Sequence, residues 1–495
     1  MGKRIIVLAL AVLLGLSGLA LAETQNIKVS GDIESMVAFR NQFYFTGKNN
    51  PNNADRHRYD RGETLWMNIA RLRADADLTD NVSATLRLIG EWIWGQEDND
   101  NQYWGGDTYM KRDSETSVDI DLAYVTLKEF LYSPLTLVIG RQELHYGNDM
   151  IIGDRDTNAF DNRGTIPGDL SKRKAFDAVR AILDYNPLTV DIVFSKVSSG
   201  GWIANWRAWQ QYGRDYERIG DWRDADIDLY GVNAKYEFGK WNTVAEAYYW
   251  YRRIGPDSNG GWILNEPITQ GGGERKADQL HTVGARLSLN PIENLTYQLE
   301  AAMQRGRANF VGALADPRQA WALETSLGYN WKDAKWTPSA TVLFAYFSGE
   351  NDTWSPGTNK KYRGWDPMFE NQTFGHIANA IFPQSNLQLV GIKGSIKPRE
   401  DITLGAEFYN YWFVKRFPNG MTALFSDYGG YDNGDNYIMK ADRDMGREID
   451  MTLTYDYTED VQFNLLTGVF IPGGAFADIN GRTATEVLGS VKVTF

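Results

Sequence analysis

Residues 484–495 read ATEVLGSVKVTF, and their side chains alternate between apolar and polar types. Successive side chains of a β-strand point to opposite sides of the sheet, so Val487, Val493 and Phe495 share one face and Glu486 and Lys492 share the other. The stretch therefore predicts a carboxyl-terminal strand with one apolar and one water-facing side. An edge strand of a soluble β-domain would show the same pattern, so the rest of the chain decides between the two.

Similar two-faced segments recur along the chain, and the connections between them alternate strictly between long and short. We predict nine long connections at about 44–62, 95–116, 144–175, 198–226, 254–278, 306–319, 349–385, 416–445 and 472–483. We predict eight short connections at about 78–81, 129–134, 185–187, 239–241, 290–294, 331–335, 397–401 and 457–460. Seventeen connections join eighteen strands. Long loops on one rim and short turns on the other are typical of outer-membrane barrels. The sequence thus predicts an all-β, up-and-down antiparallel transmembrane barrel of about 18 strands.

The amino terminus has the features of a secretory signal. Lys3 and Arg4 precede a short apolar run, and Ala20-Leu21-Ala22 supplies the small residues of a cleavage site. We therefore expect residues 1–22 to be removed and residues 23–495 to form a single outer-membrane β-barrel domain. The chain contains no cysteine, which excludes a lipoprotein anchor, disulfides and covalently attached haem, and we expect no cofactor.

The overall composition agrees with a barrel. Aromatic residues make up 13% of the chain, although the mean hydropathy is only −0.44, as expected when every second strand residue faces water. The formal net charge of −13 argues against a nucleic-acid partner. Many aromatic residues lie at the predicted strand ends, as in Trp92 and Trp94, where they would meet the lipid headgroups.

Several stretches resemble the alginate-export family of outer-membrane porins. They are GRQELHYGND at 140–149, IIGD at 151–154, FDAVR at 176–180, GREIDM at 446–451 and GVFIPG at 468–473. The terminal strand, which ends on an aromatic residue, resembles the closing strand and assembly signal of outer-membrane barrels in general. The resemblance implies a monomeric barrel in the outer membrane of a Gram-negative bacterium, surrounded by lipid and recognised by the barrel-assembly machinery through its last strand. It also implies outward passage of an anionic uronate polysaccharide through an arginine-lined constriction.

Two differences from that family leave the solute open. Alginate exporters look to have arginines on the strand where this chain has Asn464 and Leu466. They also have an arginine on the strand where this chain has Asp119 and Asp121.

Charged residues on the polar side of their strands are the candidates for lining a solute path, because opposite charges across a constriction filter solutes. Arg141 is favoured because it matches the family stretch, although Leu137 and Ile139 share its alternation phase. For each candidate, the alternative is a solvated wall residue without a role in selectivity. The other candidates are Arg71, Arg73, Arg87, Arg180, Arg286, Lys393, Glu448, Asp450 and Lys492.

Two loop patterns are weaker candidates. Trp202, Trp206 and Trp209 could stack against sugars, or could only pack the loop against its neighbours. The second pattern has the ligand spacing of a calcium loop but lacks glycine at the sixth position and glutamate at the twelfth. It consists of Asp154, Asp156, Asn158 and Asp161.

Catalysis has little support in the sequence. The four histidines lie far apart, and no zinc-protease, nucleophile-elbow or P-loop motif occurs, so we expect no enzyme. The leading hypothesis is a passive channel for an anionic polysaccharide or another hydrophilic solute. The alternatives are a general or sugar-specific diffusion porin, and a barrel that serves as a sheath or docking platform for a partner protein.

Overall fold

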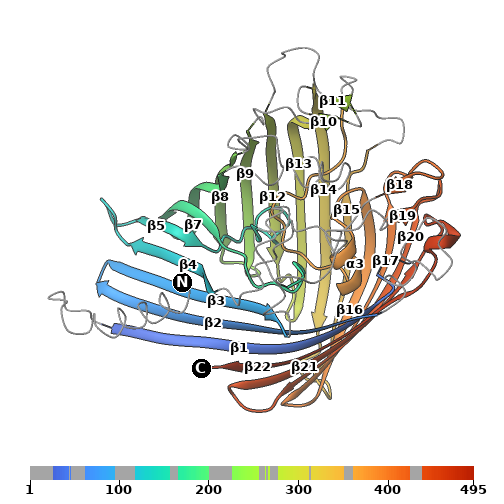
Figure 1. Cartoon of the computed structure of the whole chain (residues 1–495). Helices are drawn as coiled ribbons and strands as arrows, with labels where there is room; N and C mark the ends of the chain where they lie inside the picture. Colours follow the sequence, from blue (N-terminus) through green and yellow to red (C-terminus); the bar gives the residue numbers. More distant parts are fainter. Residues whose placement is uncertain are drawn as a thin grey trace.

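The computed structural model describes residues 26–43, 45, 62–94, 118–155, 166–199, 226–255, 262–263, 266–267, 277–311, 314–350, 361–423 and 437–495. Eighteen antiparallel strands form one closed barrel, because β1 pairs with β2 on one side and with the last strand, β22, on the other (Figure 1). The predicted barrel class is therefore confirmed. The predicted signal peptide lies outside the described residues.

The barrel strands follow one another in chain order. They are β1 (Asn26–Asn41), β2 (Glu63–Thr79), β3 (Val82–Ile93), β4 (Val118–Leu127), β5 (Leu135–Gln142), β6 (Phe176–Asp184), β7 (Leu188–Ser199), β8 (Asp226–Phe238), β9 (Thr243–Ile254), β12 (Asp278–Leu289), β13 (Leu295–Val311), β14 (Leu314–Asn330), β15 (Ser339–Phe347), β16 (Leu387–Arg399), β17 (Ile402–Phe413), β20 (Asp444–Asp456), β21 (Val461–Pro472) and β22 (Ala484–Thr494).

Short elements lie in the long connections. Two ribbons pair β10 (Trp262–Ile263) with β11 (Glu266–Pro267) and β18 (Thr422–Ala423) with β19 (Tyr437–Ile438). A helix, α3 (His376–Ile381), precedes β16, and a 3₁₀ turn, η3 (Asp478–Asn480), precedes β22. Among the described residues, no helix combines the length and the apolar character needed to cross a bilayer.

One predicted loop is instead part of a hairpin. The polar, glycine-containing residues 306–319 predict a loop, but β13 and β14 stay paired through most of them, with Gly306 opposite Arg318 and a register shift between Asn309 and Val311. Only residues 312–313 separate the two strands. A hairpin that rises above the hydrocarbon part of the membrane meets headgroups and water on its outward side, so this part needs no apolar face and its sequence does not alternate as a membrane strand does.

The two sides of the wall differ as the terminal strand predicts. On β22, outward-facing Val487 is 38% exposed, whereas inward-facing Glu486 is 3% exposed. Neighbouring strands follow the same rule, with outward residues such as Ile33 on β1 and Ile471 on β21 exposed. Apolar side chains thus point away from the barrel axis, where lipid surrounds them.

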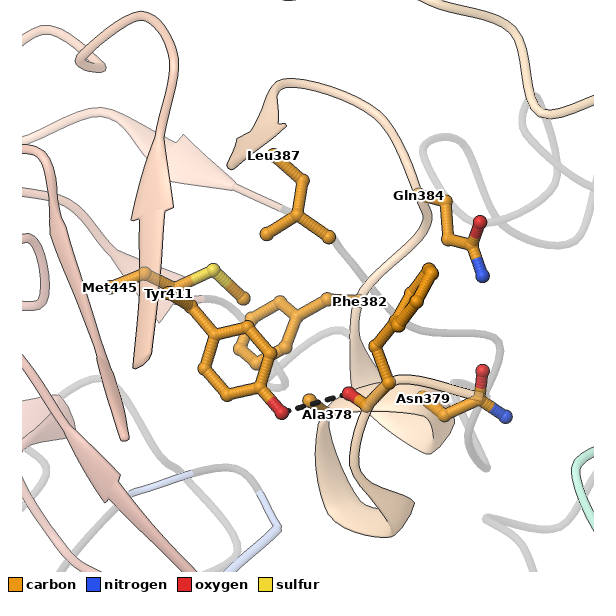
Figure 2. Close-up of a pocket in the computed structure, with 8 residues that line it drawn as sticks. Ala378, Asn379, Phe382, Gln384, Leu387, Tyr411 and Met445 are labelled. Carbon is orange, nitrogen blue, oxygen red and sulfur yellow. Dashed lines mark hydrogen bonds between the residues drawn. The ribbon is translucent and has the colours of Figure 1, made fainter. Parts of the chain in front are cut away.

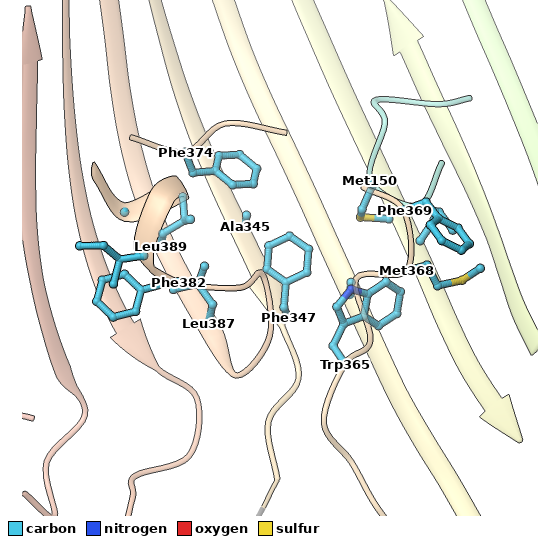
Figure 3. Close-up of a cluster of buried hydrophobic side chains, with 14 of the residues drawn as sticks. Met150, Ala345, Phe347, Trp365, Met368, Phe369, Phe374, Phe382, Leu387 and Leu389 are labelled. Atoms are coloured by element: carbon cyan, nitrogen blue, oxygen red, sulfur yellow. The ribbon is translucent and has the colours of Figure 1, made fainter. Parts of the chain in front are cut away.

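The largest apolar cluster lies on the inward side of the wall. Phe347 of β15 and Leu387 and Leu389 of β16 belong to it, together with loop residues such as Trp365 and Phe369 (Figure 3). A second, smaller cluster joins inward residues of β1, β2 and β3 to Ile166. The long loops therefore fold back into the lumen and are held there by apolar packing.

Candidate pore and its constriction

Two loops from nearly opposite sides of the barrel meet in the lumen. The β5–β6 loop spans residues 143–175 and the β15–β16 loop spans residues 348–386, with six strands between their parent strands on one side and eight on the other. Ile152 forms a parallel bridge with Phe369. The Gly153 amide donates to the Phe369 carbonyl at 2.7 Å, and the Phe369 amide donates to the Ile151 carbonyl at 3.0 Å.

A further backbone bond extends this contact, because the Asn371 amide donates to the Asp149 carbonyl at 2.9 Å. We call the contact between residues 149–154 and 369–371 the lumen clamp. Met150 and Met368 are fully buried beside it (Figure 3). The clamp narrows any solute path, because it places backbone and apolar side chains between opposite walls.

A buried ion cluster anchors the β15–β16 loop to the wall. Asp366 accepts hydrogen bonds from Arg252 at 2.9 and 2.6 Å and from Arg318 at 2.9 Å. Arg252 on β9 and Arg318 on β14 are both buried. Burial by itself would raise the pKa of Asp366, but the two guanidinium groups hold that pKa below its usual range. The carboxylate is therefore charged and fixes the loop entry to the wall.

A second anchor holds helix α3. The amides of Ile377 and Ala378 donate to Glu448 at 2.6 and 2.8 Å, and the amide of His376 donates to Asp450 at 3.3 Å. A helix amino terminus has free amides and a partial positive charge, so carboxylates are its natural partners. Glu448 and Asp450, both predicted as solute-path candidates, are fully buried and hold the loop instead.

A small apolar cavity lies beside this helix (Figure 2). Ala378, Phe382, Leu387, Tyr411 and Met445 form most of its lining. The Tyr411 hydroxyl donates to the backbone carbonyl of Phe374 at 2.8 Å, which is the dashed contact in Figure 2. The lining residues come from α3, from loop residues next to it and from the wall strands β16, β17 and β20, so the cavity lies in the packing between the helix and the wall.

The other predicted candidates lie on the inward face, and most of their charges are paired. Arg71 binds Asp32 at 2.9 Å, Arg73 binds Asp75 at 2.7 Å, Arg180 binds Asp191 at 2.5 Å, Arg286 binds Glu246 at 2.8 Å, and Lys393 lies 3.5 Å from Glu407. Arg87 pairs with both Asp121 and Glu143. Lys492 lies on β22 opposite Glu34 of β1.

The two aspartates that distinguish this chain from alginate exporters also bind arginines. Asp121 pairs with Arg87, and Asp119 pairs with Arg173 of the β5–β6 loop. Arg173 also binds the buried Glu91 of β3 at 3.0 Å. At this place a carboxylate-rich wall thus holds an arginine-bearing loop.

The expected lumen position of Arg141 has to be corrected. Val138 faces inward and is 9% exposed, whereas Ile139 faces lipid and is 43% exposed, and Arg141 shares the phase of Ile139. Its guanidinium donates to both carboxylate oxygens of Asp177 at 2.8 Å and to the Ile120 carbonyl at 2.9 Å. The polar type of the residue suggested the lumen, but strand alternation places it on the outer surface near the external rim.

The glycines of the family-like stretches have a structural role. Gly140 has φ of +124° and Gly446 has φ of +132°. A Cβ atom at Gly140 would lie 2.1 Å from the carbonyl oxygen of Ala123, and one at Gly446 would lie 2.3 Å from that of Ile471. Only glycine fits this close strand approach, so the stretches specify local backbone geometry at the external rim.

Sequence reasoning missed Arg252, Arg318 and Asp366, and it did not foresee the lumen clamp. The composition of the predicted external loop could have indicated the clamp. This loop contains Trp365, Met368 and further apolar residues, which are not expected to face water. Such residues indicate a loop that folds inward. Trp202, Trp206 and Trp209 lie outside the described residues.

The predicted calcium pattern is described only in part. Asp156, Asn158 and Asp161 lie outside the described residues. The carboxylate of Asp154 pairs with the ammonium group of Lys174. The calcium site stays a prediction.

Comparison with solved structures identifies the same fold in outer-membrane porins of Pseudomonas aeruginosa. OccK11 (OpdR) matches with a TM-score of 0.51 and 11% identity over 95% of this chain and 96% of its own. OpdL matches with a TM-score of 0.51 and 12% identity over 95% and 99% of the two chains. OccK2 (OpdF), solved in complex with glucuronate, has a TM-score of 0.50 and 10% identity over 95% and 99%. At these identities the likeness concerns the fold alone.

A search of curated proteins found no match. The sequence pattern that describes the alginate export family matches residues 45–490, which is most of the chain. The closed barrel, its apolar outer surface and the inward-folded loops agree with a channel in the outer membrane of a Gram-negative bacterium. The chain belongs to the alginate export family, as an eighteen-stranded outer-membrane porin.

Proposed function

We propose that the protein is a passive channel for small hydrophilic solutes without a strong negative charge, such as neutral saccharides, and that it is not an exporter of a long polyanion. The observation that carries this proposal is the pairing of the wall arginines. Arg71, Arg180 and Arg286 each bind a carboxylate of the same wall. A charge that is already compensated attracts a passing anion weakly, and selectivity in porins follows the net field of the lining.

The shape of the lumen supports the same proposal. The lumen clamp joins opposite walls, so a rigid polymer has less room than a small solute that can pass beside it. The family implies an anionic polysaccharide, and that solute remains the first alternative. The sheath hypothesis has less support, because the chain's own loops occupy the place where a threaded partner would lie.

Planar-bilayer recordings of the refolded mature protein test the proposal. We expect open pores with weak ion selectivity, no block by oligouronate, and uptake of neutral sugars in a liposome-swelling assay. Strong anion selectivity together with block by oligouronate would contradict it. Arg141→Ala is the matched control, because its outward position predicts unchanged conductance and selectivity.

Three further expectations stay predictions: cleavage of the signal peptide after residue 22, a monomeric barrel, and recognition of β22 by the barrel-assembly machinery.

A further inference from the structure

The outward surface of β9, β12, β13 and β14 changes character abruptly near the external rim. One row of laterally paired residues across the four strands is apolar or aromatic and exposed to lipid. It consists of Tyr249, Val283, Met303 and Trp321. Aromatic residues mark the level where hydrocarbon meets headgroups. The rows above it therefore lie among the headgroups of the outer leaflet.

Those two rows are polar and cationic. The first contains Tyr251, His281, Arg305 and Gln319, and the second contains Arg253, Gln279, Arg307 and Pro317. Neither row contains a carboxylate. Alternate residues of one strand lie about 7 Å apart on the same face, so Arg305 and Arg307 can reach a common anion.

Unlike Arg141 and Lys196, two other outward cations at this rim, Arg305 and Arg307 have no carboxylate partner among the described residues. Arg141 is bound by Asp177 at 2.8 Å, and Lys196 is bound by Asp228 at 2.8 Å. Within the part of the chain that the structure describes, Arg305 and Arg307 form no ion pair, and both are exposed. The positive charges of these two arginines are therefore available to an anion at the headgroup level.

Arg253 extends the group laterally. It lies two strands from Arg307 in the same row, and its guanidinium is 3.8 Å from Asp228, a contact that Lys196 already shares. We call Arg253, Arg305 and Arg307 the outer-rim arginine patch. His281 lies within the patch, and its ring stacks on the ring of Tyr251 with ring centres 4.6 Å apart. This stacked pair lies between the arginines and the aromatic row.

We propose that the outer-rim arginine patch binds the phosphate groups of the glycolipid that forms the outer leaflet of the membrane. Guanidinium groups match phosphate oxygens in a two-bond geometry and are weakly hydrated, so they suit this ligand better than lysines would. The aromatic row directly below would contact the acyl chains of the same molecule, and the patch would fix a lipid at one side of the barrel.

Native mass spectrometry of the detergent-purified barrel tests this inference with three probes: a bis-phosphorylated lipid A, the same glycolipid with its phosphates removed, and inorganic phosphate. We expect the wild-type protein to retain the phosphorylated glycolipid and not the dephosphorylated one. The double variant Arg305→Gln, Arg307→Gln should bind it about tenfold more weakly or worse. Arg141→Gln, on the same surface with its charge already paired, should bind like the wild type.

Equal retention of the two glycolipids by the wild-type protein would overturn the proposal without any variant. So would an equal loss of binding in Arg141→Gln and in the double variant. Displacement of the glycolipid by millimolar inorganic phosphate would identify a free-phosphate site and overturn the assignment to lipid.

Discussion

The outer and periplasmic halves of the lumen are built differently. In the outer half, inward residues such as Ile69, Phe347 and Leu389 are apolar and buried under loops. In the periplasmic half, the inward positions carry polar groups, as in Thr454 of β20, which donates to Asn464 of β21 at 3.0 Å. The wall is thus a packing surface in the outer half and a polar lining in the periplasmic half, and we expect the outer half to limit transport.

The strongest test of this comparison is the buried anchor of the β15–β16 loop. Asp366→Ala removes the nearer of the two carboxylates that the buried Arg252 and Arg318 share, and leaves Asp278 at 3.6 and 3.8 Å from them. This should cost about 3 kcal/mol in loop anchoring. We expect a larger and noisier single-channel conductance and faster proteolysis of the loop. Unchanged conductance would mean that this loop does not limit the pore.

The pH dependence of the lumen clamp gives an intermediate effect. The pKa of Glu370 is raised to about 8, mainly by burial and also by the nearby charge of Asp154, although the hydrogen bond from the Gln372 amide and the charge of Lys174 act to lower it. Glu370 also accepts hydrogen bonds from the Gln372 amide at 2.7 Å and from Gln384 at 3.0 Å. Because this pKa lies above the ordinary value of 4.5, the protonated form stabilises the folded loop.

That stabilisation is complete below the ordinary pKa and is lost as the pH rises through about 8. We expect current fluctuations in the wild-type protein to increase as the pH rises from 4.5 to about 8 and to level off above that range, where the carboxyl is ionised in both the anchored and the released loop. Glu370→Gln, which stays neutral, should give a recording that changes little over the same range. If the variant keeps the full pH response, another group controls the clamp.

The smallest effect is expected in the periplasmic half. Arg73 and Asp75 form a pair whose side chains are each about one-third exposed, at 35% and 34%. Such pairs contribute about 0–1 kcal/mol, so Asp75→Ala should leave thermal stability and conductance almost unchanged and shift ion selectivity slightly toward anions. A loss as large as that of Asp366→Ala would remove the distinction between the two halves.

The sequence predicted the barrel because its signals are local. Strand alternation, turn residues and the terminal strand can each be recognised within a few residues of sequence, and the structure confirms the predicted connections except the loop at 306–319. Strand alternation alone predicts an outward position for Arg141, since Leu137 and Ile139 share its phase. The resemblance of its stretch to the family favoured the lumen instead.

The constriction could not be predicted in the same way. Ile69 and Ile89 lie on the inward side of β2 and β3, and alternation alone gives no reason for apolar residues there. Their partner, Ile166, belongs to a distant loop, and a single sequence does not state which loop returns to which wall. The anchors at Asp366 and Glu448 depend on the same kind of long-range contact.

The lumen clamp also has a consequence for biogenesis. Ile152 and Phe369 are separated by 217 positions (369 − 152), and contacts of such long range form only after the intervening chain has been placed. A wall in which the β5–β6 and β15–β16 loops have not yet met therefore lacks the clamp and leaves a wider passage than the finished channel. We expect this contact to be among the last features of the lumen to form.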